Sequence, residues 1–353
     1  MAKGLDCGTS YYIAATEDSI KKQRNAFLTV DGDSKTVKRM LKRQSIPYVE
    51  KGGKVHVVGQ HAFNYAQIFS QTELRRPMKS GLLNPGEKDA LPVLHAIIGE
   101  FIGKSKDNEV VTYCVPSAPI DQERRVDYHE DVLRTIIEGF GYKAKKIEEA
   151  VAIGYEGLVD DDLTGIAISM GAGMCNIAVM YSGMTALSFS VDRGGDWVDQ
   201  NVAADTGFPI AKVTAIKEDS KLLDLTKSTI NNIYEEDTAE ANVLTAIRSY
   251  YGALINYLLT NLKHQFENAE KVPQFKDQVP IVIGGGTSLV KGFMEVFMEQ
   301  FNQDEFPIPV SEVKLIEDAH TAVSRGCLSE AQLVEEDENE AIEEWAYRFS
   351  KWI

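Results

Sequence analysis

The sequence has few cysteines and histidines, and neither residue type is arranged to bind a metal. Four cysteines are spread over 353 residues without a Cys-x-x-Cys pair, and the six histidines show no metal-ligand spacing. This pattern indicates neither a zinc site nor a disulfide framework, and it fits a reducing cytoplasm.

The chain also lacks long apolar runs and an excess of basic charge. No stretch is long enough to span a bilayer, and the N-terminus carries no signal-peptide pattern, so we expect a cytoplasmic protein. Acidic residues number 53 and basic residues 37, which gives a formal net charge of −16. Repulsion of this sign opposes nonspecific binding to nucleic acid and to anionic membranes. We expect no nucleic-acid partner.

What the sequence does contain is typical of a globular α/β protein. With 44% hydrophobic and 25% charged residues, the chain is long enough for two domains. Residues 110–115 read as a buried strand, and apolar residues recur at helical spacing over 91–102 and 126–140. Strands that alternate with helices predict mixed sheets flanked by helices.

The first stretch with a chemical signature is 4–10, Gly-Leu-Asp-Cys-Gly-Thr-Ser, followed by the strand-like segment 11–15. We interpret it as a strand, a tight turn and a returning strand. Gly8 allows close backbone approach, and the amides and hydroxyls of Thr9 and Ser10 can face an anion. Asp6 can hold a hydrated cation beside that anion.

Two later stretches repeat this design. Residues 166–179 again place small residues between two apolar strands, which predicts a second anion-binding hairpin. Residues 280–289 form a buried strand that ends in three glycines before a helical pattern. Glycines between a strand and a helix let a flat ligand lie against bare backbone. The three turns together predict a nucleotide clamp.

With these motifs the sequence resembles the actin superfamily, and within it most closely the MreB-type bacterial actins and their magnetosome relatives. Further segments match in order between Gly4 and Gly326: 76–82 (Arg-Pro-Met-Lys-Ser-Gly-Leu), 115–117 (Val-Pro-Ser), 123–125 (Glu-Arg-Arg), 147–149 (Ile-Glu-Glu) and 194–199 (Gly-Gly-Asp-Trp-Val-Asp). The ordered set covers nearly the whole chain.

The resemblance implies an α/β actin-like fold of two domains, each with a mixed sheet flanked by helices and a smaller inserted lobe. A nucleotide would lie in the cleft between the domains. On this basis we expect a first domain over 1–146 with a lobe at about 32–76. A second domain would cover 147–322, with a lobe at about 192–250. Residues 323–353 would return to the first domain and end in an acidic amphipathic C-terminal helix.

The same resemblance implies ATP and Mg²⁺ as cofactors and assigns roles to individual residues. Asp6 would hold Mg²⁺ through water, and Glu149 would orient the attacking water. From the residues alone, Glu149 is better interpreted as a solvated carboxylate at a helix start, beside Glu148. The nucleotide-binding residues would be Gly8, Thr9, Ser10, Ser169, Gly171, Ala172, Gly173, Lys217, Glu218, Gly284, Gly285, Gly286 and Thr287.

The chain departs from the family pattern at three positions. Ser169 stands where the family usually has an aspartate that organises the metal and its waters. Met174 replaces the usual threonine, and Ala150 replaces a proline. Loss of an anion near the metal weakens Mg²⁺ positioning more than phosphate binding. We therefore expect ATP binding with slow hydrolysis.

The C-terminal segment differs in character from the rest. Residues 335–340 form an acidic run, after which apolar residues fall on one helical face: Ala341, Ile342, Trp345, Ala346, Phe349, Trp352 and Ile353. Such a helix can dock on its own protein, bind a protein partner or lie on a membrane surface.

Two functions from different classes follow. In the first, ATP binding closes the two domains and favours head-to-tail self-assembly into a filament. In the second, a non-polymerising ATP-binding adaptor recruits a partner through the C-terminal tail. Small-molecule phosphoryl transfer of the sugar-kinase type has less support, because the strongest matches are to filament-forming relatives.

Overall fold

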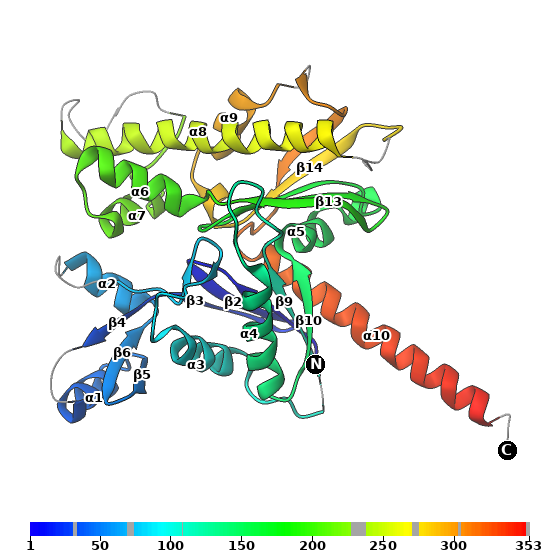
Figure 1. Cartoon of the computed structure of the whole chain (residues 1–353), viewed down its shortest axis with the longest axis horizontal. Coiled ribbons are helices and arrows are strands. Elements are labelled where there is room, and N and C mark those ends of the chain that lie inside the picture. The colour runs from blue at the N-terminus through cyan, green and yellow to red at the C-terminus, as the bar shows by residue number, and fades with distance from the viewer. Residues whose placement is uncertain are drawn as a thin grey trace.

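The chain folds into two α/β halves that lie one above the other in Figure 1. The computed structural model describes residues 1–30, 34–68, 74–107, 109–226, 238–269, 275–302 and 305–350. Each half is built on a five-stranded sheet with helices packed on it.

The first half contains the sheet β10-β9-β1-β2-β3. Strands β1, β9 and β10 run parallel, whereas β1, β2 and β3 form antiparallel hairpins. The apolar faces of α3 and α4 complete its core. The bounds are β1 Lys3–Cys7, β2 Tyr11–Thr16, β3 Ser19–Arg24, β9 Val110–Val115, β10 Lys143–Glu148, α3 Ala90–Ile102 and α4 Val126–Gly139.

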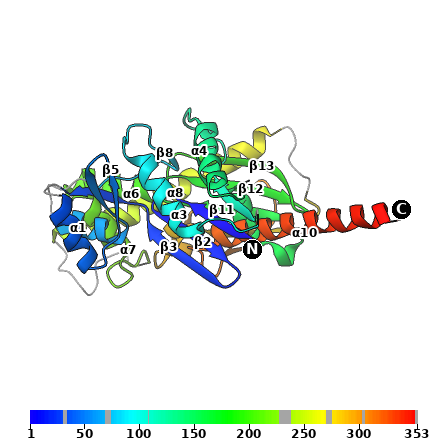
Figure 2. The same cartoon turned by 90° about the horizontal axis from the view of Figure 1, so that it is seen from below.

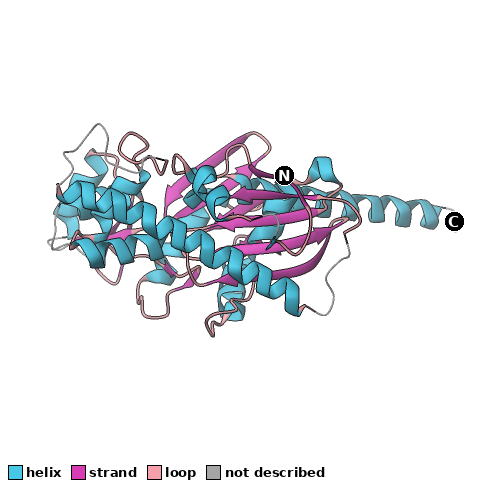
Figure 3. Cartoon of the chain, turned by 90° about the horizontal axis from the view of Figure 1, so that it is seen from above, coloured by secondary structure: helices cyan, strands magenta, loops and turns pink. Residues whose placement is uncertain are grey.

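The second half repeats this topology in the sheet β13-β12-β11-β14-β15. Here β11, β14 and β15 are parallel, and β11, β12 and β13 are antiparallel. The long helix α8 runs across these strands, as the view from above shows (Figure 3). The bounds are β11 Gly165–Met170, β12 Cys175–Tyr181, β13 Met184–Val191, β14 Val279–Gly284, β15 Val310–Leu315, α8 Ala239–Asn268 and α9 Phe293–Gln300. The predicted mixed sheets and the repeated hairpin are confirmed.

Smaller lobes extend both halves on the same side of the molecule (Figure 1). The first is a three-stranded sheet, β4-β6-β5, with two helices: β4 Phe27–Val30, β5 Tyr48–Lys51, β6 Lys54–Val58, α1 Ser34–Arg43 and α2 Gln60–Ile68. The second contains α6 Gly195–Thr206 and α7 Ile210–Glu218. The first lobe starts at β4, before the expected residue 32, because β4 pairs with β6. Residues 31–33, 69–73 and 227–237 of the expected lobes lie outside the described residues.

Short elements complete the chain. A two-stranded ribbon, β7 Met78–Lys79 and β8 Leu82–Leu83, lies between the first lobe and α3, and single turns of 3-10 helix occur at η1 Val159–Asp161 and η2 Gly286–Leu289.

Two helices pack against one another where the halves meet. Helix α5 (Glu149–Gly157) contacts the second sheet, and the start of α10 (Ala322–Ser350) contacts both α5 and β1. The contact is close because the facing residues are small: a Cβ added at Gly326 would lie 1.9 Å from the carbonyl oxygen of Ala152. The small residues Ala152 and Gly326 therefore let the two helices pack closely.

Helix α10 is continuous from Ala322 to Ser350, so the acidic run and the amphipathic segment belong to one helix. Its first part packs on the first half, where Glu335 accepts a hydrogen bond from the Val110 amide at 3.2 Å. Beyond that, the helix projects away from the body of the molecule (Figures 1 and 2). Trp352 and Ile353 lie outside the described residues. Among the described helices, none has the length and apolarity to cross a membrane.

Replacing Gly326 by alanine should destabilise the protein strongly, because the new methyl group would overlap backbone that cannot move aside. Overpacking of this kind costs about 3 kcal/mol or more. Gly252, inside α8, has open space around it. The same substitution there should stabilise the helix by about 1 kcal/mol. Midpoints of urea denaturation should therefore move in opposite directions for Gly326→Ala and Gly252→Ala; a shift in the same direction would contradict this packing.

Candidate functional site

A cavity of about 290 Å³ opens between the two halves. Its walls come from the turn between β1 and β2, the turn between β11 and β12, the glycines after β14, and the end of α7. Most residues singled out in the sequence line it: Asp6, Gly8, Thr9, Ser10, Glu149, Ser169, Gly171, Ala172, Gly173, Lys217, Glu218, Gly285, Gly286 and Thr287. The three turns, far apart in sequence, are brought together.

Gly284 is the singled-out residue that does not line the cavity. It ends β14, and a Cβ there would lie 2.3 Å from Cδ1 of Ile153 on α5. Gly284 therefore serves helix packing. The next residue, Gly285, has a φ of +95°, and its Cβ would lie 2.5 Å from the Met170 carbonyl oxygen. Only glycine fits this turn.

The two hairpin turns meet a third segment, the Arg76–Leu82 motif. Thr9 Oγ1 accepts a hydrogen bond from the Gly81 amide at 2.9 Å. A Cβ at Gly173 would lie 2.1 Å from the Gly81 nitrogen, and the Met174 side chain contacts the other side of Gly81. Both segments need glycine because a side chain at either position would prevent this close approach. The contact holds the first half against the second.

Two arginines also join the halves. Arg76 donates to Asp196, with Nη1 2.7 Å from Oδ2. Arg24, which is 2% exposed, forms an ion pair with Glu218. Glu218, one of the expected nucleotide-binding residues, lines the cavity and already has a cationic partner. Lys217 is likewise held, with Nζ 2.8 Å from both Asp199 Oδ1 and the Gly195 carbonyl oxygen.

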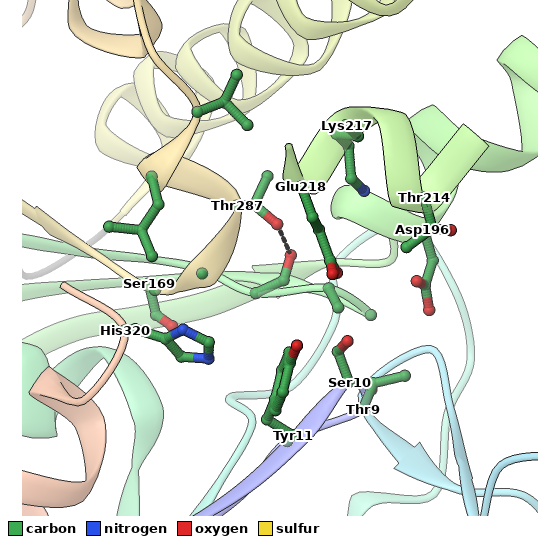
Figure 4. A pocket seen from close by; sticks show the side chains of 18 of the residues that line it. Thr9, Ser10, Tyr11, Ser169, Asp196, Thr214, Lys217, Glu218, Thr287 and His320 are labelled. Atoms are coloured by element: carbon green, nitrogen blue, oxygen red, sulfur yellow. Dashed lines mark hydrogen bonds between the residues drawn. The ribbon is translucent and has the colours of Figure 1, made fainter. Parts of the chain in front are cut away.

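Figure 4 shows how these side chains face the cavity. Lys217, Glu218 and Thr214 extend from α7 on one side, and Thr9, Ser10 and Tyr11 lie on the other, with His320 and Ser169 to the left. Thr287 Oγ1 donates to the Gly171 carbonyl oxygen at 2.9 Å and so ties the glycine-rich turn after β14 to the second hairpin.

The cavity contains two buried carboxylates, Asp6 and Glu149, and within the described residues neither forms an ion pair with a basic side chain. Burial raises the pKa of Asp6 to about 7, and Cys114 donates to it through Sγ at 3.3 Å. Burial, and then repulsion from Asp6, raise the pKa of Glu149 to about 8. Desolvated carboxylates that repel each other favour protonation or a bound cation.

The orientation of Glu149 is fixed by donors from two neighbouring strands. Asn176 Nδ2 and Ser169 Oγ both approach Glu149 Oε2, at 2.9 and 3.4 Å. They converge because Ser169 and Asn176 are paired directly across β11 and β12. Asn176 Oδ1 in turn accepts a hydrogen bond from the backbone amide of Ser117 at 3.0 Å, and this bond fixes the orientation of the Asn176 side chain. Asn176 was not identified from the sequence; its signal was a lone amide inside an apolar strand.

These residues fit a magnesium ion held largely by water and phosphate. The described residues contain no group of three or more histidine, cysteine or acidic side chains that could bind a metal directly. Mg²⁺ commonly takes one or two carboxylates, several waters and the phosphates of a nucleotide. Asp6 and Glu149 supply the carboxylates of such an arrangement.

Comparison with known proteins agrees with this geometry. The model of the Volactin family matches residues 1–331. The chain belongs to the Volactin family. A search of curated proteins finds no relative.

Solved structures share the fold at low identity. A MamK double helical filament is 18% identical over 94% of this chain and 98% of that one, with a TM-score of 0.70. MreB5 of Spiroplasma citri bound to ADP is 17% identical over 97% and 98%, with a TM-score of 0.59. The ethanolamine utilization protein EutJ from Carboxydothermus hydrogenoformans is 16% identical over 92% and 88%, with a TM-score of 0.50. The expected actin-like fold, similar to that of the MamK and MreB5 structures, is confirmed.

Substitution Glu149→Gln should stabilise the nucleotide-free protein more at pH 8 than at pH 5. The pKa of Glu149 rises from 4.5 to about 8 on folding, so between these values the folded state holds a proton that the unfolded state has lost. Stability therefore falls as pH rises through this window. Glutamine does not titrate, and the difference should grow by up to about 1.4 kcal/mol per pH unit.

The measurement is urea denaturation of both proteins in EDTA at pH 5, 6.5 and 8. The matched control is Glu123→Gln, an exposed site in the first half, whose effect should stay constant. A Glu149→Gln effect that does not change with pH would show that the carboxyl is not desolvated.

Proposed function

We propose that this chain binds ATP with Mg²⁺ in the interdomain cavity and assembles into filaments in a nucleotide-dependent way. The observation that carries the proposal is the carboxylate pair Asp6 and Glu149, which lies without a cation between two small-residue turns. Similar structures are those of MreB5 bound to ADP and AMPPNP and of MamK bound to AMPPNP.

Each part of the cavity has a task in this proposal. Backbone amides at 8–10 and 171–173 surround the phosphates, which bind well to turns whose amides point inward. Asp6 holds the hydrated Mg²⁺, which neutralises phosphate charge. Glu149, held by Asn176 and Ser169, orients a water for attack. The glycines at 285 and 286 leave bare backbone for the nucleoside.

Assembly follows from closure of the cavity. A nucleotide that touches both hairpin turns stabilises the arrangement in which the two halves are joined by Arg24–Glu218, Arg76–Asp196 and the close approach of Gly173 to Gly81. A rigid closed subunit presents fixed opposite ends, and head-to-tail contacts between such ends propagate into a filament. The MamK neighbour is described as a double helical filament.

A second function is favoured by the projecting helix α10. A helix that leaves the body of the molecule is available to a protein partner or a membrane surface, which suits an ATP-binding adaptor. Truncation after Leu333 separates the two functions. Filaments that persist without the tail assign it to recruitment or anchoring, and lost assembly assigns it to the polymer contact.

The four cysteines are buried free thiols, in keeping with action in the cytoplasm.

Assembly is tested by light scattering after Mg-ATP is added to the purified protein, with phosphate release followed in the same cuvette. We expect scattering to rise promptly while little phosphate appears. Buffer with Mg²⁺ but no nucleotide is the control. Demonstrable ATP binding without scattering at any practical concentration would reject the filament and favour the adaptor.

Substitution Ser169→Asp should accelerate hydrolysis without a comparable change in ATP affinity. Ser169 lines the cavity beside Glu149, so a carboxylate there adds an anion that organises Mg²⁺ and its waters. Side chains that hydrogen-bond to the ligands of a metal typically change metal affinity or activity by about 10–100-fold. Phosphate release should rise by about tenfold, whereas Ser169→Asn, of equal size but neutral, should not raise it. Unchanged turnover in Ser169→Asp would mean that another step limits the rate.

A further inference from the structure

The cations around the cavity are not equivalent. Lys217 and Lys291 line it but are each paired with a carboxylate, Asp199 and Asp224, at 2.8 Å. The third lysine of the lining is Lys22, on β3. Within the part of the chain that the structure describes, no carboxylate oxygen lies within 4 Å of its ammonium group.

The groups in direct contact with the Lys22 ammonium are neutral and fix its position, while Glu218 and Arg24 act on its charge from a longer distance. Its Nζ lies 2.8 Å from His320 Nδ1 and 4.4 Å from the centre of the Tyr11 ring. Burial, and then the positive charges of Lys22 and Arg24, lower the pKa of His320 to about 4, so the ring is neutral and accepts the hydrogen bond. Tyr11 and His320 themselves pack edge to face at 4.8 Å and line the cavity (Figure 4).

The strand register carries Lys22 toward the anion-binding turn. Lys22 is the cross-strand partner of Ile13, another lining residue, which lies three positions beyond Ser10 on β2. The next cation on the strand, Arg24, is already used by Glu218. Lys21 belongs to the opposite face of the sheet, since successive side chains alternate, and its Nζ lies 3.5 Å from the Phe101 carbonyl oxygen.

We propose that Lys22 is a phosphate-binding residue of this cavity, positioned by Tyr11 and His320, and that it makes the site prefer phosphorylated nucleosides over the free nucleoside. This inference rests on the proposed nucleotide-binding function. A lysine whose direct contacts are neutral does not have to leave a carboxylate before it meets an incoming anion, and because His320 and Tyr11 already hold it, binding costs little side-chain entropy. The other lining lysines would have to give up a carboxylate first.

The test is calorimetric titration of the full-length protein with ATP, ADP and adenosine, at fixed Mg²⁺. Loss of a charge-assisted hydrogen bond should weaken ATP and ADP binding to Lys22→Gln by about tenfold or more. Adenosine binding should stay within about twofold, because it has no phosphate. Lys22→Arg should keep most of the affinity, and Lys21→Gln is the matched control that should bind all three ligands as the parent protein does.

The outcomes separate this inference from the function on which it rests. If the parent protein binds ATP and Lys22→Gln binds it equally well, the inference fails alone. If Lys22→Gln loses ATP and adenosine to the same extent, Lys22 supports the base, the ribose or the fold, and the inference also fails. If the parent protein binds no ATP, both fail. Urea denaturation of Lys22→Gln should match the parent, which shows that the loss is not misfolding.

Discussion

The structure depends on one electrostatic constraint, a desolvated pair of carboxylates placed where the two halves of the chain meet. Asp6 and Glu149 come from different elements, β1 and the first residue of α5, and burial raises the pKa of both. Leaving two such groups uncompensated opposes folding above neutral pH. The surrounding cavity, two turns rich in amides and a third rich in glycine, is shaped for a ligand that brings a cation with it. A magnesium nucleotide would supply both the cation for the carboxylates and the phosphates for the amide-rich turns.

The rest of the architecture brings the turns together from two copies of one topology. Each sheet has three parallel strands and two antiparallel hairpins in the same order, so each contributes one turn to the cavity from the same place. Contacts between the halves at the cavity include Arg24 with Glu218, Arg76 with Asp196, and Gly173 against Gly81. A ligand in the cavity would touch residues of both halves and so favour this arrangement of them.

Local features of the sequence predicted much of this. The hairpins and the glycine turn were recognisable because strand, turn and glycine signals lie within about ten residues of each other. Features that depend on distant packing were not. The contact of Gly284 with Ile153 and the ion pair of Glu218 with Arg24 from the other half depend on residues far away in the sequence. The roles of Asn176 and Lys22 arise from strand register and from partners as distant as His320, which no local pattern reveals.

Proton release on binding tests the central claim most directly. Titration of Mg-ATP into the protein at pH 7, in two buffers with different ionisation enthalpies, measures the protons exchanged. Since the nucleotide-free pKa values of Asp6 and Glu149 are about 7 and about 8, a cation beside them should displace protons. The account predicts a net release that shrinks in Glu149→Gln. Binding without proton release, or no binding, would contradict it.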